Sequence, residues 1–243
     1  MGVPWDGDFD RCFLFDDQGR FVPGAYVVGL LAQVFLAKEP GAVIVHDPRV
    51  EWNTRAVIAA HGGRAERART GHAYFKQALR DTGAVYGGEM SAHHYFRDFM
   101  ACDSGMIPWL LVAELIGRSG RSLADLLAEA RAAFPSSGEI NFRVPDAAAA
   151  AARVEAALAG GAEVDRLDGL TLSFPDWRLN LRASNTEPLL RPNVETRGEA
   201  AGLAAGASID IRFEDVKLKK GDHTMSATAD TRNLITESKE DNN

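Results

Sequence analysis

The sequence predicts an α/β protein, in which a first domain with a parallel or mixed sheet is followed by a smaller α+β domain. Three observations support this prediction. Up to about residue 134, short apolar runs bounded by turn residues alternate with helical stretches. A turn-rich segment at 135–138 (Pro-Ser-Ser-Gly) then interrupts the alternation. Beyond it, one alanine-rich helical stretch is followed by several strand-like segments.

Turn residues mark the ends of the elements in the first domain. A strand-like run at 12–15 is followed by an apolar helix at 26–37, which begins after Pro23-Gly24 and ends before Pro40-Gly41. Ser122 is expected to cap the last helix of this domain. Further strands are expected at 42–46, 64–69 and 84–86, and further helices at 53–61, 72–80, 106–116 and 123–134.

The second domain is expected to contain a strand at 139–144, a helix at 146–158 and several strands between 163 and 196. Ile209, Ile211 and Phe213 alternate like one more strand. Lysine largely replaces arginine beyond residue 206, which indicates a tail of different origin, and its polar end at 221–243 is expected to be disordered. We therefore divide the chain into segments 1–20, 21–135, 138–206 and 207–243.

The bulk properties describe a soluble globular protein, with 46% hydrophobic and 25% charged residues. The net charge of -7 argues against nucleic acid or an anionic membrane as the main partner. The apolar run at 106–113 is too short to cross a bilayer, and no signal peptide precedes the first motif. Cys12 and Cys102 are expected to be reduced thiols of a cytoplasmic protein.

Three carboxylates form the first chemical motif, at residues 6–11 (Asp-Gly-Asp-Phe-Asp-Arg). On an extended backbone alternate residues point to one side, so Asp6, Asp8 and Asp10 would converge. Without a cation these charges would repel, and we therefore expect a hard divalent metal, with Mg²⁺ preferred. The residue types at positions 11 and 17 disfavour an EF-hand loop, whereas a solvated acidic turn remains an alternative.

The second motif, at residues 87–94 (Gly-Gly-Glu-Met-Ser-Ala-His-His), directly follows a predicted strand. Ligands of such sheets bind at the carboxyl ends of strands. Glu89, Ser91 and His93 offer hydrogen-bond acceptors and donors in alternation, which suits sugar hydroxyls. A zinc site is the alternative interpretation, although the motif lacks cysteine.

The third motif, at residues 182–188 (Arg-Ala-Ser-Asn-Thr-Glu-Pro), combines a guanidinium group with hydroxyls, an amide and backbone N–H groups. This set is suited to an anion, and phosphate is the natural ligand. A locally capped turn is the alternative, because Ser, Asn and Thr favour turns on their own.

Two single residues lie between these motifs. His72 follows Thr70-Gly71 at the start of a predicted helix, where it could carry a proton or donate a hydrogen bond. Arg49 follows the end of a predicted strand, where it could meet a phosphate or a hydroxyl. For both residues the alternative is an ordinary structural or solvated side chain.

All of these features occur together and in this order in the α-D-phosphohexomutases. The sequence resembles the bacterial phosphomannomutases of that family over about residues 2–198, most specifically at 6–11, 70–72, 88–93 and 182–188. The resemblance implies a three-layer α/β/α mixed-sheet domain at 21–135 and an α+β phosphate-binding domain at 138–206. Residues 1–20 would be the end of the family's second domain. The implied reaction is an isomerisation of mannose 6-phosphate to mannose 1-phosphate, extending to glucose phosphates, for GDP-mannose and surface polysaccharide synthesis.

The resemblance also implies roles for individual residues. Arg11, His72 and His93 would be catalytic. Asp6, Asp8 and Asp10 would bind Mg²⁺. The substrate, a hexose phosphate, would be bound by Arg49, Glu89, Ser91 and His93 and, at the phosphate that is not transferred, by Arg182, Ser184, Asn185 and Thr186. Many relatives carry Gly at the position of Ala92.

The family's nucleophile is a phosphoserine in a loop reading Thr-Ala-Ser-His-Asn-Pro, and residues 1–243 do not contain this loop. We therefore expect a fragment that lacks the phosphoserine domain, either truncated or completed by a separate polypeptide, and not active as a mutase alone. The alternatives are a non-catalytic hexose-phosphate binding protein and an inactive gene remnant.

Overall fold

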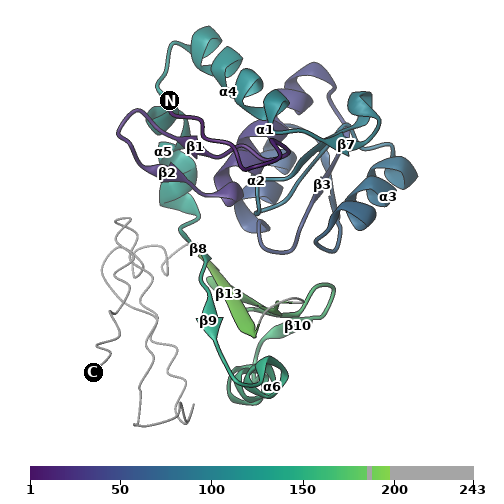
Figure 1. The fold of residues 1–243 in the computed structure, drawn as a ribbon, viewed down its shortest axis with the longest axis vertical. Coiled ribbons are helices and arrows are strands. Elements are labelled where there is room, and N and C mark those ends of the chain that lie inside the picture. The colour runs from purple at the N-terminus through teal and green to yellow at the C-terminus, as the bar shows by residue number, and fades with distance from the viewer. Residues whose placement is uncertain (185–187, 198–243) are drawn as a thin grey trace.

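The computed structural model describes residues 1–184 and 188–197. These residues form a larger α/β unit and a smaller α+β unit, which follow one another along the chain (Figure 1). The N-terminal segment packs against the larger unit through the hairpin of β1 (Leu14–Phe15) and β2 (Phe21–Val22).

The larger unit is built on a five-stranded mixed sheet with the order β4-β3-β5-β6-β7. Strands β4, β3 and β5 are parallel to one another. Strand β6 pairs antiparallel with β5, and β7 pairs antiparallel with β6. The strands are β3 (Val43–His46), β4 (Arg64–Arg67), β5 (Tyr86–Gly88), β6 (His94–Phe96) and β7 (Cys102–Asp103). A mixed sheet was one of the two arrangements predicted from the alternation of strands and helices.

Helices cover both faces of this sheet, which confirms the predicted three-layer α/β/α arrangement. Alternate residues of a strand point to opposite faces, and Ile44 of β3 packs into the cluster around α1, whereas Val43 and Val45 pack with Phe75 and Leu79 of α3. Helix α1 in turn contacts α2, α4 and α5. The helices are α1 (Gly24–Lys38), α2 (Trp52–Ala60), α3 (His72–Thr82), η1 (Arg97–Phe99), α4 (Met106–Ser119) and α5 (Leu123–Ala133).

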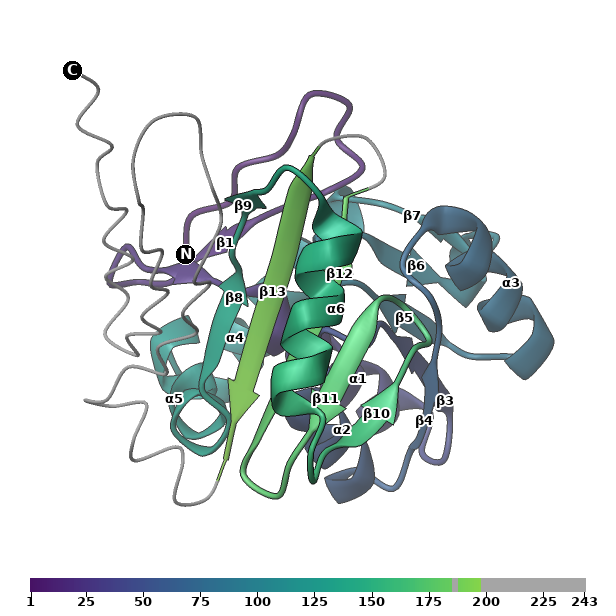
Figure 2. The ribbon, with the colours of Figure 1, turned by 90° about the horizontal axis from the view of Figure 1, so that it is seen from below.

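The smaller unit is an antiparallel sheet covered on one face by α6 (Figure 2). Its strands follow the order β10-β11-β12-β13-β8, and β9 pairs with the other end of β13. Val154 of α6 packs with Leu172, Leu179 and Leu190 in a second hydrophobic core. The elements are β8 (Ser136–Glu139), β9 (Phe142–Arg143), α6 (Ala147–Leu158), β10 (Glu163–Asp165), β11 (Leu170–Ser173), β12 (Trp177–Ala183) and β13 (Leu189–Thr196).

The predicted helices are all present, with each end within three residues of its predicted place, and Ser122 caps α5 by accepting a hydrogen bond from the amide of Asp125. The turn predicted at 135–138 was wrong, because residues 136–138 belong to β8, which pairs with β13. The strand expected at 84–86 runs from residue 86 to 88, and the short strands β6 and β7 were not predicted. The expected strand at 209–213 and the expected disorder at 221–243 lie outside the described residues.

Gly24 allows the start of α1 to approach the loop that follows β5. A Cβ atom at this position would lie 2.3 Å from the carbonyl oxygen of Met90. We expect Gly24→Ala to lower the free energy of unfolding by about 1–3 kcal/mol, measured by urea denaturation. Gly117, in α4, is the matched control because a Cβ there would contact nothing within 4 Å. Gly117→Ala should raise the free energy of unfolding by about 0.5–1 kcal/mol, and equal effects would contradict this account.

Candidate functional site

The three carboxylates of the N-terminal motif converge in the structure. Asp6, Asp8 and Asp10 each offer an oxygen within 4.8 Å of the others. The backbone that carries them is not the extended strand that the sequence analysis assumed. It is a turn in which Phe9 adopts a left-handed conformation with φ of 63°. Convergence was therefore predicted correctly, but its cause is a tight loop.

Close backbone packing fixes this acidic loop against the start of α4. The amide of Gly105 donates to the carbonyl oxygen of Phe9 at 3.2 Å, and the indole Nε1 of Trp5 donates to the carbonyl of Gly105 at 3.0 Å. A Cβ at Gly105 would lie 2.7 Å from that same Phe9 oxygen. Glycine is therefore needed at position 105 for the loop to reach this place.

The carboxylates of the loop differ in their surroundings. Desolvation alone would raise the pKa of Asp6. Two nitrogens of the Arg11 guanidinium, each 2.6 Å from Asp6 Oδ2, outweigh this effect and hold the pKa below its usual value. Desolvation raises the pKa of Asp10, and the charges of Asp6 and Asp8 raise it further against the opposing effect of His93. Oδ1 of Asp10 is buried and lacks a hydrogen-bond partner within the described residues, and its ion-pair contact is Nε of Arg11 at 3.5 Å.

The acidic loop meets the 87–94 motif directly. Arg11 and His93 form an isolated antiparallel backbone bridge, which brings Asp10 Oδ2 to 3.7 Å from His93 Nδ1. His72, the first residue of α3, lies beside them with its ring centroid 4.4 Å from that of His93. The predicted metal and catalytic residues of three separate motifs are thus brought together.

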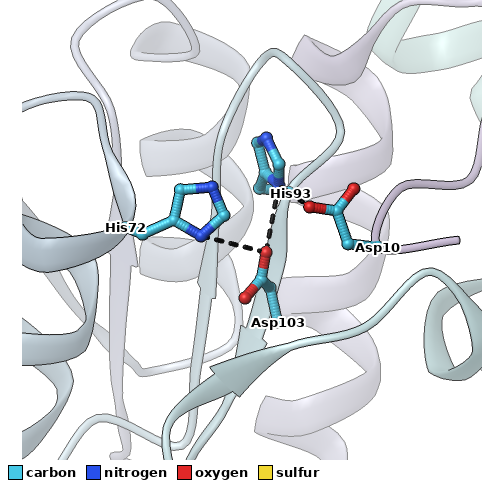
Figure 3. A group of neighbouring side chains, drawn as sticks. All are labelled: Asp10, His72, His93 and Asp103. Carbon is cyan, nitrogen blue, oxygen red and sulfur yellow. Dashed lines mark hydrogen bonds and ion pairs between the residues drawn. The ribbon is translucent and has the colours of Figure 1, made fainter. Parts of the chain in front are cut away.

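A residue that the sequence analysis did not identify, Asp103, contacts both histidines of this group. Oδ2 of Asp103 is 3.1 Å from Nδ1 of His93 and 3.2 Å from Nδ1 of His72, as Figure 3 shows. Lys76 approaches its other oxygen at 3.7 Å. Burial lowers the pKa of His93, and the neighbouring His72 lowers it further. Asp103 sits on the two-residue strand β7, which is too short to give a periodic signal in the sequence.

Glu89 is turned inward. Its side chain is 1% exposed, and its two oxygens accept hydrogen bonds from the amide of Gly71 at 2.8 Å and from the hydroxyl of Tyr95 at 2.7 Å. Burial raises the pKa of this carboxyl, and the charge of Asp47 adds to the effect. In this conformation Glu89 holds the turn before His72. Ser91 is half-buried on the same loop.

Arg49 is also committed to contacts within the protein. It is 4% exposed, and its guanidinium pairs with Asp47 Oδ2 at 2.7 Å and with Glu139 Oε2 at 2.8 Å. Asp47 accepts in addition from the amide of Met90 at 2.9 Å. Arg49 therefore joins the end of β3 to β8 of the smaller unit, a role that the sequence analysis did not anticipate.

The third motif lies in the hairpin between β12 and β13. Arg182 belongs to β12 and pairs with Arg191 in the register of the two strands, and the amide of Ser184 donates to the carbonyl of Leu189 at 2.8 Å. Asn185 and Thr186 lie outside the described residues. The turn before His72 contacts the same unit, because the amide of Thr70 donates to Asp168 Oδ2 at 3.2 Å.

Comparison with known proteins assigns this arrangement to a family. Residues 23–134 match the family model for "Phosphoglucomutase/phosphomannomutase, alpha/beta/alpha domain III", and residues 139–208 match "Phosphoglucomutase/phosphomannomutase, C-terminal domain". The chain belongs to the phosphoglucomutase/phosphomannomutase family. This confirms the resemblance inferred from the four motifs. A third model, CARDB, matches residues 176–243, which lie mostly outside the described residues.

Individual relatives extend this match. The chain is 62% identical over 200 residues to a phosphomannomutase of Salmonella montevideo, a match that covers 82% of this chain and 44% of that protein. It is 60% identical over 204 residues to a phosphohexose mutase of Xanthomonas campestris, covering 84% of this chain and 46% of the relative. It thus spans less than half the length of the curated relatives it matches.

The fold is also found among solved structures. A phosphoglucomutase/phosphomannomutase family protein from Burkholderia thailandensis superposes with a TM-score of 0.70 at 30% identity, over 82% of this chain and 43% of that one. Within the part of the chain that the structure describes, no helix is both long and apolar enough to span a membrane.

The buried histidine next to the site makes stability depend on pH. Burial lowers the pKa of His94 to about 3, and its Nδ1 lies 2.7 Å from the hydroxyl of Tyr86. In the unfolded chain the pKa is about 6.5. Below that pH the unfolded state takes up a proton that the folded state does not, so stability present at neutral pH is lost as the pH falls.

We expect His94→Gln to flatten this dependence. Between about pH 6.5 and 4.5, the slope of the unfolding free energy should be shallower by up to about 1.4 kcal/mol per pH unit than in the unsubstituted chain. Urea denaturation at several pH values measures both slopes. His46, whose pKa is also lowered by burial, retains its own contribution in the variant. Identical slopes for the two proteins would show that His94 does not carry the effect.

Proposed function

We propose that this chain supplies the metal-, sugar- and phosphate-binding loops of a phosphomannomutase, the enzyme that interconverts mannose 6-phosphate and mannose 1-phosphate. The observation that carries the proposal is the meeting of the acidic loop with His93, through the backbone bridge at Arg11, beside His72. The names of the relatives at 60–62% identity support this reaction class. Glucose phosphates are further candidate substrates.

The acidic loop is suited to Mg²⁺. Three carboxylates within 4.8 Å of one another, one of them with a buried oxygen that lacks a hydrogen-bond partner in the described residues, are the hard donors that this ion prefers. Asp6, Asp8 and Asp10 would hold it, and Arg11 would fix the orientation of Asp6 through its two-atom contact. The ion would neutralise negative charge on a phosphoryl group during transfer.

The side chains around the acidic loop have complementary tasks in this proposal. His93 would hold or release a proton of the sugar hydroxyl that gains or loses the phosphoryl group, because its lowered pKa leaves it neutral at physiological pH. His72 would donate a hydrogen bond to the phosphoryl group. Glu89 and Ser91 would bind hydroxyls of the sugar ring, for which Glu89, now 1% exposed, must become accessible to the ligand.

The phosphate at the other end of the sugar would be bound by the β12–β13 hairpin. Arg182 supplies the charge, and Ser184, Asn185 and Thr186 supply further donors to the phosphate oxygens. Arg49 would complete the substrate contacts only after it releases Glu139, since both of its present partners are carboxylates. Binding at two separate ends orients the sugar for transfer.

The phosphoserine of the family's reaction would come from residues that are not part of the 243, on a longer chain or a separate polypeptide. The proposal places the complete enzyme in the cytoplasm, in nucleotide-sugar and surface polysaccharide synthesis. A non-catalytic hexose-phosphate binding protein is the alternative. Sequencing the DNA beside this reading frame separates the two, because only the enzyme requires a nearby serine loop.

Replacing Arg182 tests the assignment of the phosphate. We expect Arg182→Ala to weaken the binding of mannose 1-phosphate by roughly 1.5–3 kcal/mol, the range for hydrogen bonds to a charged group. Isothermal titration calorimetry on the two proteins measures this change. Arg166 is a matched control, because it lies on the same unit with a side chain that is 63% exposed and paired with Glu155. Arg166→Ala should leave the affinity unchanged, and an equal loss in both variants would refute the assignment.

Mg²⁺ binding to residues 1–243 should be weak, because the phosphoserine oxygen that would complete the coordination is not part of these residues. We expect calorimetry to give a dissociation constant above the micromolar range, and Asp8→Asn should weaken Mg²⁺ binding further. The control is Asp98→Asn, which changes an exposed carboxylate that pairs with Arg97 outside the loop. Micromolar or tighter binding by the unsubstituted chain would contradict the proposed coordination.

A further inference from the structure

The group around Asp103 has the composition of a second kind of metal site. Asp10, His72, His93 and Asp103 each offer one ligand atom, and these four atoms lie within 4.8 Å of one another. They come from four separate parts of the chain: the acidic loop, the start of α3, the loop after β5, and β7. Only Asp10 also belongs to the three-carboxylate set.

Three of the six distances among these side chains are close to the edges of a small coordination tetrahedron. Zinc lies about 2.0–2.1 Å from imidazole nitrogen and about 2.0–2.2 Å from carboxylate oxygen. In a tetrahedron with those radii, neighbouring ligand atoms are about 3.3–3.5 Å apart. Asp103 Oδ2 lies 3.1 Å from His93 Nδ1 and 3.2 Å from His72 Nδ1, and Asp10 Oδ2 lies 3.7 Å from His93 Nδ1. The remaining distances lie within 4.8 Å, so the four side chains would draw closer together around an ion.

The donor types separate this set from the magnesium-type loop. Two imidazoles and two carboxylates favour Zn²⁺ and similar borderline metals, whereas Mg²⁺ prefers oxygen donors and retained waters. The two carboxylates balance the charge of a dication. Nδ1 of His93 is hydrogen-bonded to Oδ2 of Asp103, and Nδ1 of His72 lies 3.2 Å from the same oxygen. An ion bound by both Nδ1 atoms would take the place of protons there, and each imidazole would keep its proton on Nε2.

The exposure of these side chains also suits a metal site. Asp103 and His93 have side chains that are 8% and 14% exposed, which holds them in place, whereas His72 is 47% exposed and leaves one side open for an ion to enter. Cys102 precedes Asp103 on β7, and alternation along a strand directs its thiol to the opposite face of the sheet.

We propose that Asp10, His72, His93 and Asp103 form a binding site for a borderline divalent transition metal, with Zn²⁺ as the preferred ion. The site uses the two histidines of the proposed reaction and shares Asp10 with the three-carboxylate set. Its occupation therefore removes His93 and His72 from proton transfer and phosphate contact, and it competes with Mg²⁺ for Asp10. The competition rests on the proposed function, whereas Zn²⁺ binding itself does not.

Calorimetric titration of the untagged chain with Zn²⁺ tests the site. We expect Zn²⁺ affinity to fall at least about tenfold in Asp103→Asn and in His72→Ala, since even removing a side chain that only hydrogen-bonds a metal ligand typically costs 10–100-fold in metal affinity. Asp8→Asn, which changes only the three-carboxylate set, should leave Zn²⁺ affinity unchanged while weakening Mg²⁺ binding. Cys102→Ser should also leave Zn²⁺ affinity unchanged.

Each outcome decides between named alternatives. Equal Zn²⁺ affinity in the unsubstituted chain and Asp103→Asn overturns the proposal, and a loss confined to Asp8→Asn places Zn²⁺ on the three carboxylates instead. Circular dichroism checks that each variant folds, and His72→Ala, at a half-exposed position, provides the test if Asp103→Asn does not fold. Visible absorption of Co²⁺ gives a second readout, because tetrahedral coordination produces intense bands that Asp103→Asn should abolish.

Discussion

One buried carboxylate, that of Asp47, holds the 87–94 loop and the smaller unit in place beside the larger sheet. It accepts from the backbone amide of Arg49 at 2.7 Å, from the Arg49 guanidinium at 2.7 Å and from the amide of Met90 at 2.9 Å. Burial alone would raise the pKa of Asp47, but Arg49 outweighs it and keeps the carboxyl ionised. Through these bonds the end of β3, the 87–94 loop and, by way of Glu139, the smaller unit are held together. Removing one partner of such a buried pair typically costs about 3–5 kcal/mol.

Some parts of the site could be predicted from the sequence and others could not. The motifs at 6–11, 70–72 and 87–94 were predictable, because each contains its chemically distinctive residues within a few positions. Their convergence was not predictable from spacing alone. It depends on a backbone bridge between Arg11 and His93 and on a glycine at position 105 that lets the acidic loop approach α4. Asp103 and Asp47 were missed because nothing around them repeats or alternates, and their importance comes from partners far away along the chain.

The same reasoning applies to the fold. The helices and the buried strand β3 follow from local periodicity and from turn residues, so the prediction placed them within a few residues. The turn predicted at 135–138 was wrong for a physical reason. Its serines and glycine favour a turn locally, but pairing with β13 supplies ladder hydrogen bonds, and Ser137 Oγ accepts from the amide of Val194 at 2.9 Å. Partners 57 residues away override local preference.

The contacts between the two units differ in burial from one edge of the interface to the other. This difference determines how firmly the phosphate hairpin is positioned. Near β8 and β13 the contacts are buried, with Asn193 donating to the carbonyl of Arg49 at 2.6 Å and Glu195 accepting from the amide of Trp52 at 3.3 Å. Arg67 and Asp165 meet at the exposed rim, where an ion pair contributes about 0–1 kcal/mol. The buried edge therefore fixes the relative orientation of the units. Because Glu139 lies on that edge and Arg49 is its partner, a substrate that recruits Arg49 would act on the contact that holds the two units together.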